Sequence, residues 1–257
     1  MNPVYIISAT QISAQEPLSE AWMLAPKKLA SGAAPCLDPD FREFIPPVQA
    51  RRMGTLLKRA LVTAQKALAL SGIPMPDAIL CGTGLGCMEP TERILATFRE
   101  SGEGSVSPTD FMQSTHNTIA STIAIHLKCH GYNCTYSQGS VSFESALLDA
   151  FLQLKAGLLS SALVCAGEEN LSVAMVLSTS PRGALCKLAD VQIRHGAAPE
   201  VTQDPVLRDS DYKPLFGECA VSSAAGLYMG AHLLDRQPLQ VLGTGGEDYS
   251  RVLIQPL

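Results

Sequence analysis

Charged residues are scarce in this chain of 257 residues. Only 17% of the residues are Asp, Glu, Lys or Arg, and the formal net charge is -5. The basic residues gather in nothing larger than the pairs Arg51-Arg52 and Lys58-Arg59. A protein that binds nucleic acid carries a basic patch or stripe that meets the phosphates. We therefore expect no nucleic-acid partner.

Long hydrophobic runs are lacking as well, although 46% of the residues are apolar. No stretch approaches the roughly 18 uninterrupted apolar residues of a membrane span. Residues 1–10 show neither the basic region nor the cleavage site of a secretion signal. We expect a cytoplasmic protein without a membrane span. With so much apolar sequence and so little charge, part of its surface is expected to meet another subunit.

The eight cysteines form no C-x-x-C pair and lie mostly in apolar segments. This usage predicts buried free thiols in a reducing cytoplasm. A metal site built from Cys129, His130 and Cys134 is the alternative, but that spacing is not a zinc pattern. His126 and His130 lie one helical turn apart and are more typical of structural histidines. No metal ion is expected.

Short apolar runs alternate with helical patterns along the chain. Extended segments are predicted at residues 4–8, 77–81, 133–137, 161–166 and 251–254, and helices at residues 51–71, 89–99, 115–129, 142–157 and 224–234. Strands and helices in this order predict an α/β fold. A chain of this length is compatible with one domain over residues 1–257.

A glycine run, Gly82-Thr83-Gly84-Leu85-Gly86, follows the second predicted strand. It lacks the third glycine at the dinucleotide-binding spacing, and no acidic residue ends a following strand. A tight turn is therefore favoured over a nucleotide site, and no cofactor is expected. Glu168 and Glu169 follow the fourth strand, where they are expected to hold backbone N–H groups; a role as acid and base is the alternative.

The turn before the helix at residues 142–157 reads Ser137-Gln138-Gly139-Ser140. A helix that follows a buried strand presents free backbone N–H groups and the positive end of its dipole at such a turn. Ser140 is therefore a candidate nucleophile, with His116 or His195 as a candidate base. The segment does not match the G-x-S-x-G elbow of the hydrolase fold, which counts against a serine hydrolase.

The ordered set of motifs resembles the beta-ketoacyl synthases of the thiolase superfamily. The turn from Thr135 to Ser140, the helix after it and Ala166-Gly167-Glu168-Glu169 are similar to the family's S-x-S-x-x-C turn, its small-residue helix and its G-G-x-E-like corner. Further similar segments are Arg51-Arg52-Met53, Thr83-Gly84-Leu85-Gly86, Ser223-Ala224-Ala225-Gly226 and Gly243-Thr244-Gly245-Gly246-Glu247-Asp248. The resemblance implies a thiolase-like layered α/β fold. It also implies truncation, with a shortened C-terminal helix and strand, because the family's typical chain is much longer.

The same resemblance implies a loss of chemistry. Ser140 stands where the family has its cysteine, and a serine hydroxyl needs a neighbouring base, whereas roughly a few per cent of a free cysteine is thiolate at neutral pH. The family's second histidine falls near Ala220, and the phenylalanine beside its cysteine is Thr244. His195 and the residues after it only faintly resemble the first histidine motif.

A subunit with these losses resembles a chain-length factor, which does not catalyse condensation but pairs with an active ketosynthase and shapes the product tunnel. Short versions of this size resemble the partner subunits of aryl-polyene-type pigment pathways. The resemblance implies a heterodimer with an interface from Asn133 to Ser137, and acyl carrier protein as an indirect partner. The residues expected at the tunnel or interface are His116, Gln138, Ser140 and Thr244.

Three alternatives remain open from the sequence. One is an active serine-dependent acyltransferase or hydrolase that uses Ser140. Another is a self-associating scaffold protein without a tunnel. The third concerns Thr115, His116 and Asn117, for which capping of the helix that they precede is favoured over lining a tunnel.

Overall fold

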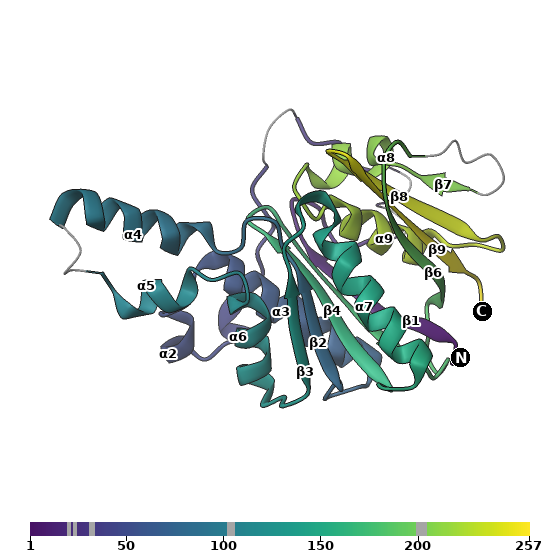
Figure 1. The fold of residues 1–257 in the computed structure, drawn as a ribbon, viewed down its shortest axis with the longest axis horizontal. Coiled ribbons are helices and arrows are strands. Elements are labelled where there is room, and N and C mark those ends of the chain that lie inside the picture. The colour runs from purple at the N-terminus through teal and green to yellow at the C-terminus, as the bar shows by residue number, and fades with distance from the viewer. Residues whose placement is uncertain (20–21, 23–24, 31–33, 102–105, 199–204) are drawn as a thin grey trace.

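A computed structural model describes residues 1–19, 22, 25–30, 34–101, 106–198 and 205–257 (Figure 1). The strands are β1 (Val4–Ile12), β2 (Ala78–Gly82), β3 (Tyr132–Tyr136), β4 (Ser161–Glu168), β5 (Leu171–Ser178), β6 (Cys186–His195), β7 (Val206–Leu207), β8 (Leu239–Gly245) and β9 (Asp248–Gln255). The helices are η1 (Phe41–Glu43), α2 (Pro47–Ala50), α3 (Thr55–Ser71), α4 (Met88–Ser101), α5 (Pro108–Gln113), α6 (Thr118–Leu127), η3 (Gly139–Val141), α7 (Ser142–Ala156), α8 (Asp209–Phe216) and α9 (Ser222–Leu233).

The strands form one mixed sheet in the order β3-β2-β4-β5-β1-β6-β9-β8-β7. In its first half β2 is parallel to β3 and β4, whereas β5 runs antiparallel between β4 and β1. Every residue of β4 and β5 is buried. Strands that are covered on both faces form continuous apolar runs rather than alternating ones, and these two sequences do so.

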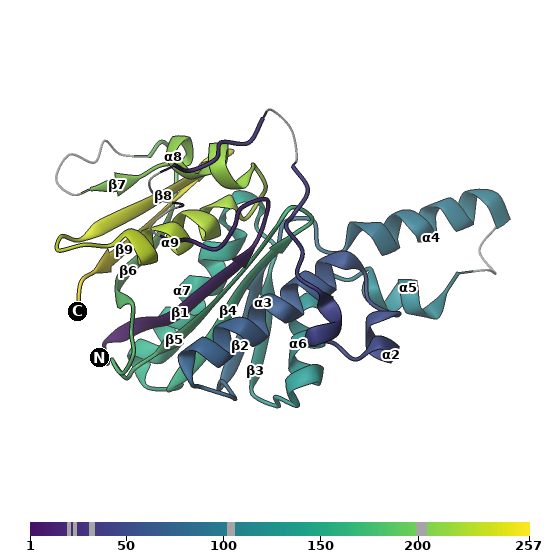
Figure 2. The ribbon, with the colours of Figure 1, turned by 180° about the vertical axis from the view of Figure 1, so that it is seen from behind.

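Helices cover both faces of this first half (Figures 1 and 2). On one face, α3 and α6 pack against the sheet through side chains such as Leu61, Ile119 and Ile123. On the other face lie α7 and α9, whose apolar residues share one core with side chains of both halves of the sheet. The two central helices are therefore enclosed between the first half and the second half, which consists of β6, β9, β8 and β7.

Two helices project from this body. In Figures 1 and 2, α4 and α5 extend past α6, on the same side of the molecule as the edge strand β3. Pro90 is the buried residue of α4. The exposed apolar side chains of this arm are Leu95, Phe98, Phe111 and Met112.

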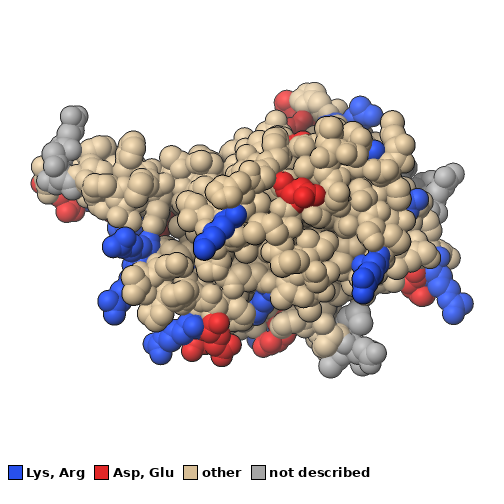
Figure 3. All heavy atoms as spheres, turned by 90° about the horizontal axis from the view of Figure 1, so that it is seen from below, with Lys and Arg blue, Asp and Glu red and all other residues tan. Residues whose placement is uncertain are grey.

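The structure confirms the strands and helices predicted around Ser140 and differs elsewhere in understandable ways. Helix α3 begins at Thr55 rather than at Arg51, because Gly54 takes an extended conformation as its N-cap. The chain after β5 contributes β6, β7, β8 and α8 in addition to the one helix and one strand that were expected there. None of the helices in the described ranges is long and apolar enough to cross a membrane. The Lys and Arg side chains on the face in Figure 3 are dispersed.

A substitution at Gly82 tests the contact between β2 and α7. A Cβ atom at this position would lie 2.5 Å from the backbone of Phe143, which cannot move without shifting the buried helix. We expect Gly82→Ala to lower the free energy of unfolding by about 3 kcal/mol, as overpacking of a core does. Urea denaturation measures the change. Gly54→Ala is the control, because the nearest atom there belongs to the flexible side chain of Glu89; equal losses in the two variants would contradict the prediction.

Candidate functional site

Three parallel strands bring the segments that follow them together at their carboxyl ends. β2, β3 and β4 all end there, so the turn at residues 83–86, the turn at residues 137–140 and the end of β4 meet. Ligand sites of α/β sheets form at such carboxyl ends. The segment before α9 reaches the same place from the second half of the sheet, since a Cβ on Gly84 would overlap Ala220. The β8–β9 hairpin reaches it at Gly245, where a Cβ would overlap Ser140.

The glycine-rich turn wraps around a carboxylate of the protein itself. Glu168 is buried, and its Oε1 accepts hydrogen bonds from the Thr83 hydroxyl at 3.1 Å, from the Leu85 N–H at 3.2 Å and from the Gly84 N–H. The tight turn predicted for this segment is confirmed, as is the role of Glu168 in holding backbone N–H groups. These donors are occupied internally and do not face a nucleotide.

Ser140 lies on η3, directly before α7, and is half-buried. Its hydroxyl donates a hydrogen bond of 2.9 Å to the backbone carbonyl of Gly245 on β8. The contact is close, because a Cβ on Gly245 would overlap the Ser140 side chain. The candidate nucleophile is therefore bonded to a carbonyl oxygen, which cannot remove its proton under ordinary conditions.

The two candidate bases have other surroundings. His116 is exposed and packs at the turn of Gly86, where a Cβ would lie 3.2 Å from the imidazole ring. His195 is exposed at the end of β6, with Nδ1 3.2 Å from Asp248 Oδ1 and Nε2 3.6 Å from Glu247 Oε2. Within the described ranges, no recorded hydrogen bond joins an imidazole to Ser140.

The residues at the start of α6 and His126 near its end make local contacts. Asn117 is the N-cap of α6 but its side chain makes no capping hydrogen bond. Thr115 instead meets the Thr118 hydroxyl at 3.0 Å. His126 lies 3.1 Å from the Gln65 amide. The part of the chain that the structure describes contains no group of three or more residues able to hold a metal ion.

Gln138 and Thr244 make structural contacts on the two sides of Ser140. The Gln138 N–H donates to the Ser142 hydroxyl at 2.8 Å, and its side-chain oxygen accepts from Ser145, so Gln138 closes the turn into α7. Thr244 was expected beside Ser140. Its neighbour Gly245 makes that contact, because alternate residues of β8 face opposite sides, and the Thr244 hydroxyl donates to Asp209 at 2.5 Å.

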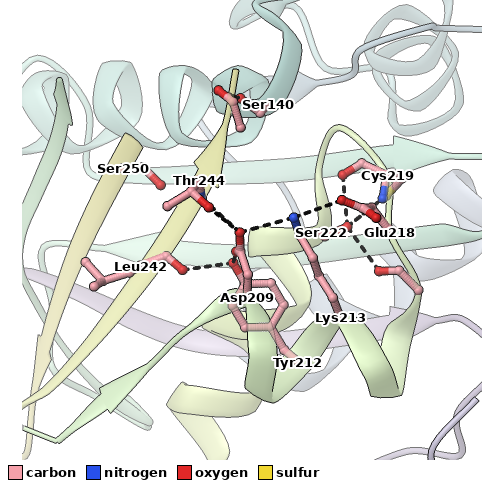
Figure 4. Close-up of polar contacts among 12 residues, drawn as sticks. Ser140, Asp209, Tyr212, Lys213, Glu218, Cys219, Ser222, Leu242, Thr244 and Ser250 are labelled. Carbon is pink, nitrogen blue, oxygen red and sulfur yellow. Dashed lines mark hydrogen bonds and ion pairs between the residues drawn. The ribbon is translucent and has the colours of Figure 1, made fainter. Parts of the chain in front are cut away.

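Asp209 is the centre of a polar network that no sequence motif indicated (Figure 4). It accepts hydrogen bonds from Thr244 and Tyr212 and lies 3.1 Å from the Lys213 ammonium. Burial opposes its charge, but the hydrogen bonds from Thr244, Tyr212 and Lys213 outweigh burial and lower the pKa of Asp209. Because Lys213 also pairs with Glu218 at 3.2 Å, this network joins α8 to β8 and to the segment before α9.

A second feature that the sequence did not reveal is the burial of Glu144, one turn of helix after Ser140. Its Oε1 accepts a hydrogen bond of 2.6 Å from the Ser250 hydroxyl, and Oε2 has no hydrogen-bond partner among the described residues. Ser223 also faces this carboxyl. Burial raises the pKa of Glu144 and outweighs the two serine hydroxyls, which lower it.

The raised pKa predicts a pH-dependent stability. Folded Glu144 binds its proton more tightly than the unfolded chain does, so its stabilising contribution is complete in acid and is lost as the pH rises through the folded pKa. Glu144→Gln removes this titration. We expect the variant to match the parent near pH 4 and to exceed it by about 1 kcal/mol at pH 8, where an incompletely bonded carboxylate would be buried.

Urea denaturation from pH 4 to pH 8 measures this difference. Glu100→Gln serves as the control, because the Glu100 side chain is 69% exposed on α4. A difference between Glu144→Gln and the parent that does not change with pH would contradict the assignment.

Residues 19–186 match the family model of the beta-ketoacyl synthase N-terminal domain. No curated protein matches the sequence significantly. Among solved structures, the chain is similar to one of a type II polyketide synthase acyl-carrier protein in complex with its ketosynthase bound to the hexaketide (AntDE:AntF). That likeness has a TM-score of 0.82 at 12% identity and covers 100% of both chains.

Two further structures are complexes of a ketosynthase with a chain length factor. The chain is similar to the ketosynthase ApeO in complex with its chain length factor ApeC from Xenorhabdus doucetiae, with a TM-score of 0.67, 18% identity and coverage of 98% of this chain and 99% of that one. It is also similar to the ishigamide ketosynthase/chain length factor, with a TM-score of 0.78, 13% identity and coverage of 99% of each chain. At these identities the likeness shows the fold, and it confirms the expected thiolase-like α/β fold in a chain that is short for a ketosynthase.

Proposed function

Because this chain belongs to the beta-ketoacyl synthase family, we propose that it is a non-catalytic ketosynthase-like subunit, a chain-length factor, that pairs with an active beta-ketoacyl-ACP synthase in the cytoplasm. The observation that carries the proposal is the state of Ser140, whose hydroxyl donates to the Gly245 carbonyl. Condensation needs a nucleophile that can accept and release an acyl chain. A serine bonded in this way lacks the base that would activate it.

The surroundings of Ser140 support the same conclusion. Ala220 lies near Gly84 at the site edge, where the family resemblance calls for a histidine, and an alanine methyl can neither move a proton nor stabilise an oxyanion. His195 pairs with Asp248 and Glu247 instead. A serine-dependent acyltransferase or hydrolase is the alternative, and nothing in these contacts favours it.

The partner and the pathway are inferred from the relatives. Two similar structures are described as a ketosynthase with its chain length factor, and another contains an acyl-carrier protein. By this analogy the subunit would form a heterodimer with a ketosynthase in polyketide or fatty-acid-type biosynthesis, including aryl polyenes, and would meet acyl carrier protein through that partner. His116, Gln138, Ser140 and Thr244 would lie near the tunnel or interface, and no cofactor or metal would be needed.

The free edge of β3 supports an interface from Asn133 to Ser137. Within the described ranges β3 pairs with β2 alone, so its other edge is open. The strand carries no charge, proline or bulge that would protect such an edge. The exposed Leu152 lies on α7 three residues after Asp149, whose carboxylate accepts hydrogen bonds from Tyr132 and Tyr136 of this strand. An open strand edge with an exposed apolar side chain on the helix beside it fits addition of a partner strand.

Mass spectrometry of the co-purified complex tests the loss of catalysis. We expect the chain to bind a ketosynthase encoded in the same gene neighbourhood, and acyl thioesters to label the partner's cysteine but not Ser140. The Ser140→Cys variant is also expected to give no condensation product on its own, because no imidazole is bonded at this position. An acyl adduct on Ser140 in the parent chain would contradict the proposal and favour the acyltransferase.

Leu152→Glu tests the position of the interface. The side chain is 54% exposed, so the substitution leaves the core intact, but a charge at the centre of an apolar interface is costly. We expect the affinity for the ketosynthase to fall by about a hundredfold, as for the loss of a central contact. Leu70→Glu is the control, because Leu70 is 70% exposed on α3 and distant in sequence from the edge. If the two variants lowered the affinity equally, the interface would not include Leu152.

A further inference from the structure

Asp149 on α7 holds an unusual position over the open edge of the sheet. Tyr132 lies two residues before Cys134 on β3, and Tyr136 lies two residues after it. Both donate their phenolic hydroxyl to Asp149 Oδ2 at 2.9 Å. Gln153 donates its amide to Oδ1 at 2.8 Å. Partial burial and the carboxylate raise the pKa of Tyr132 to about 12, so this phenol stays a neutral donor. The carboxylate is thereby fixed above the middle of β3.

This carboxylate has little compensating charge nearby. β3 contains no charged residue, and Glu144, the other acidic residue of α7, is buried and bonded to Ser250 on β9. Lys155 comes later on α7, with its ammonium 4.9 Å from the ring centre of Phe151. Within the described ranges Asp149 forms no ion pair with Lys or Arg, and its neighbour on the helix surface is the exposed Leu152.

Pairing of two copies of this chain through β3 would bring two such carboxylates together. A two-fold axis between antiparallel strands makes residues near the axis meet their own copies. If all five residues of β3 pair with the β3 of a second copy, the two-fold axis passes beside the central residue, Cys134, over which Asp149 lies. Neighbouring strands lie about 4.8 Å apart, so the two carboxylates would approach to within about 10 Å. In an interface that excludes water, like charges at this distance repel each other.

We propose that Asp149 prevents this chain from pairing with itself and selects a ketosynthase partner that presents a lysine or arginine opposite it. The inference rests on the proposed function, since it takes the β3 edge as the interface. The tyrosines contribute apolar area that any partner could cover. The fixed carboxylate distinguishes between partners, because it repels a second Asp149 and attracts a cation.

Sedimentation equilibrium of the isolated chain tests the repulsion. Asp149→Asn removes the charge but keeps an oxygen that the tyrosines can reach, and we expect it to strengthen self-association about tenfold or more. Asp149→Lys restores a like-charge pair, so it should remain as weakly associated as the parent. Asp235→Asn is the control, because Asp235 is an exposed aspartate that follows α9.

The heterodimer supplies the complementary measurement. With the co-expressed ketosynthase, Asp149→Asn should weaken binding about tenfold at low salt and reduce the dependence of binding on salt. The inference would be overturned if Asp149→Asn self-associated no more strongly than the parent. It would also be overturned if Asp149→Asn and Asp149→Lys strengthened self-association equally, because loss of the tyrosine hydrogen bonds, and not loss of the charge, would then explain the effect. If the parent chain binds no ketosynthase, the proposed function is wrong. The self-association measurements would still test whether Asp149 opposes pairing of two copies.

Discussion

Burial of α7 on both flanks is the constraint on which the rest of the structure depends. One half of the sheet packs on each side of the helix, so its sequence must be apolar around most of its circumference, with small residues such as Ala146 and Ala150 at close contacts. The helix cannot slide without disturbing both halves. Its first turn, and Ser140 just before it, are therefore fixed against the β8–β9 hairpin, which comes from the other end of the chain.

The sequence was most informative where local patterns and tertiary contacts agree. The helical period of α3 and the strand-to-helix turn at Ser140 are visible in the sequence because each has a period or a turn signal of its own. β5 was not predicted, since LSVAMVLS is a short apolar run without period, directly after another such run. Strand β6 alternates irregularly between buried and partly exposed residues, and the first five residues of β8 are all buried without alternation, so neither strand has a clear period in the sequence.

The candidate site was predictable in its turns but not in its contacts. The tight turn at residues 82–86 and the role of Glu168 in holding backbone N–H groups were both predicted, but not that these two features contact each other. The contacts of Asp209 with Thr244 and of Ser140 with Gly245 join residues 35 and 105 positions apart, and their geometry depends on strand register. The burial of Glu144 was equally hidden, since a glutamate in the first turn of a helix usually faces solvent. Polar groups that the topology encloses leave no periodic signal in the sequence.

The open edge of β3 also has a consequence for the cell that makes the protein. Asp149 opposes the two-fold pairing of two folded copies, but the free chain still exposes an unpaired strand without charged residues, which can template non-specific aggregation. If the subunit is made in excess over the chain that covers this edge, the surplus becomes a substrate for chaperones and proteases. Balanced synthesis of the two chains, for example from adjacent genes on one messenger RNA, would keep that surplus small. The geometry of one strand thus bears on gene order and dosage as well as on assembly.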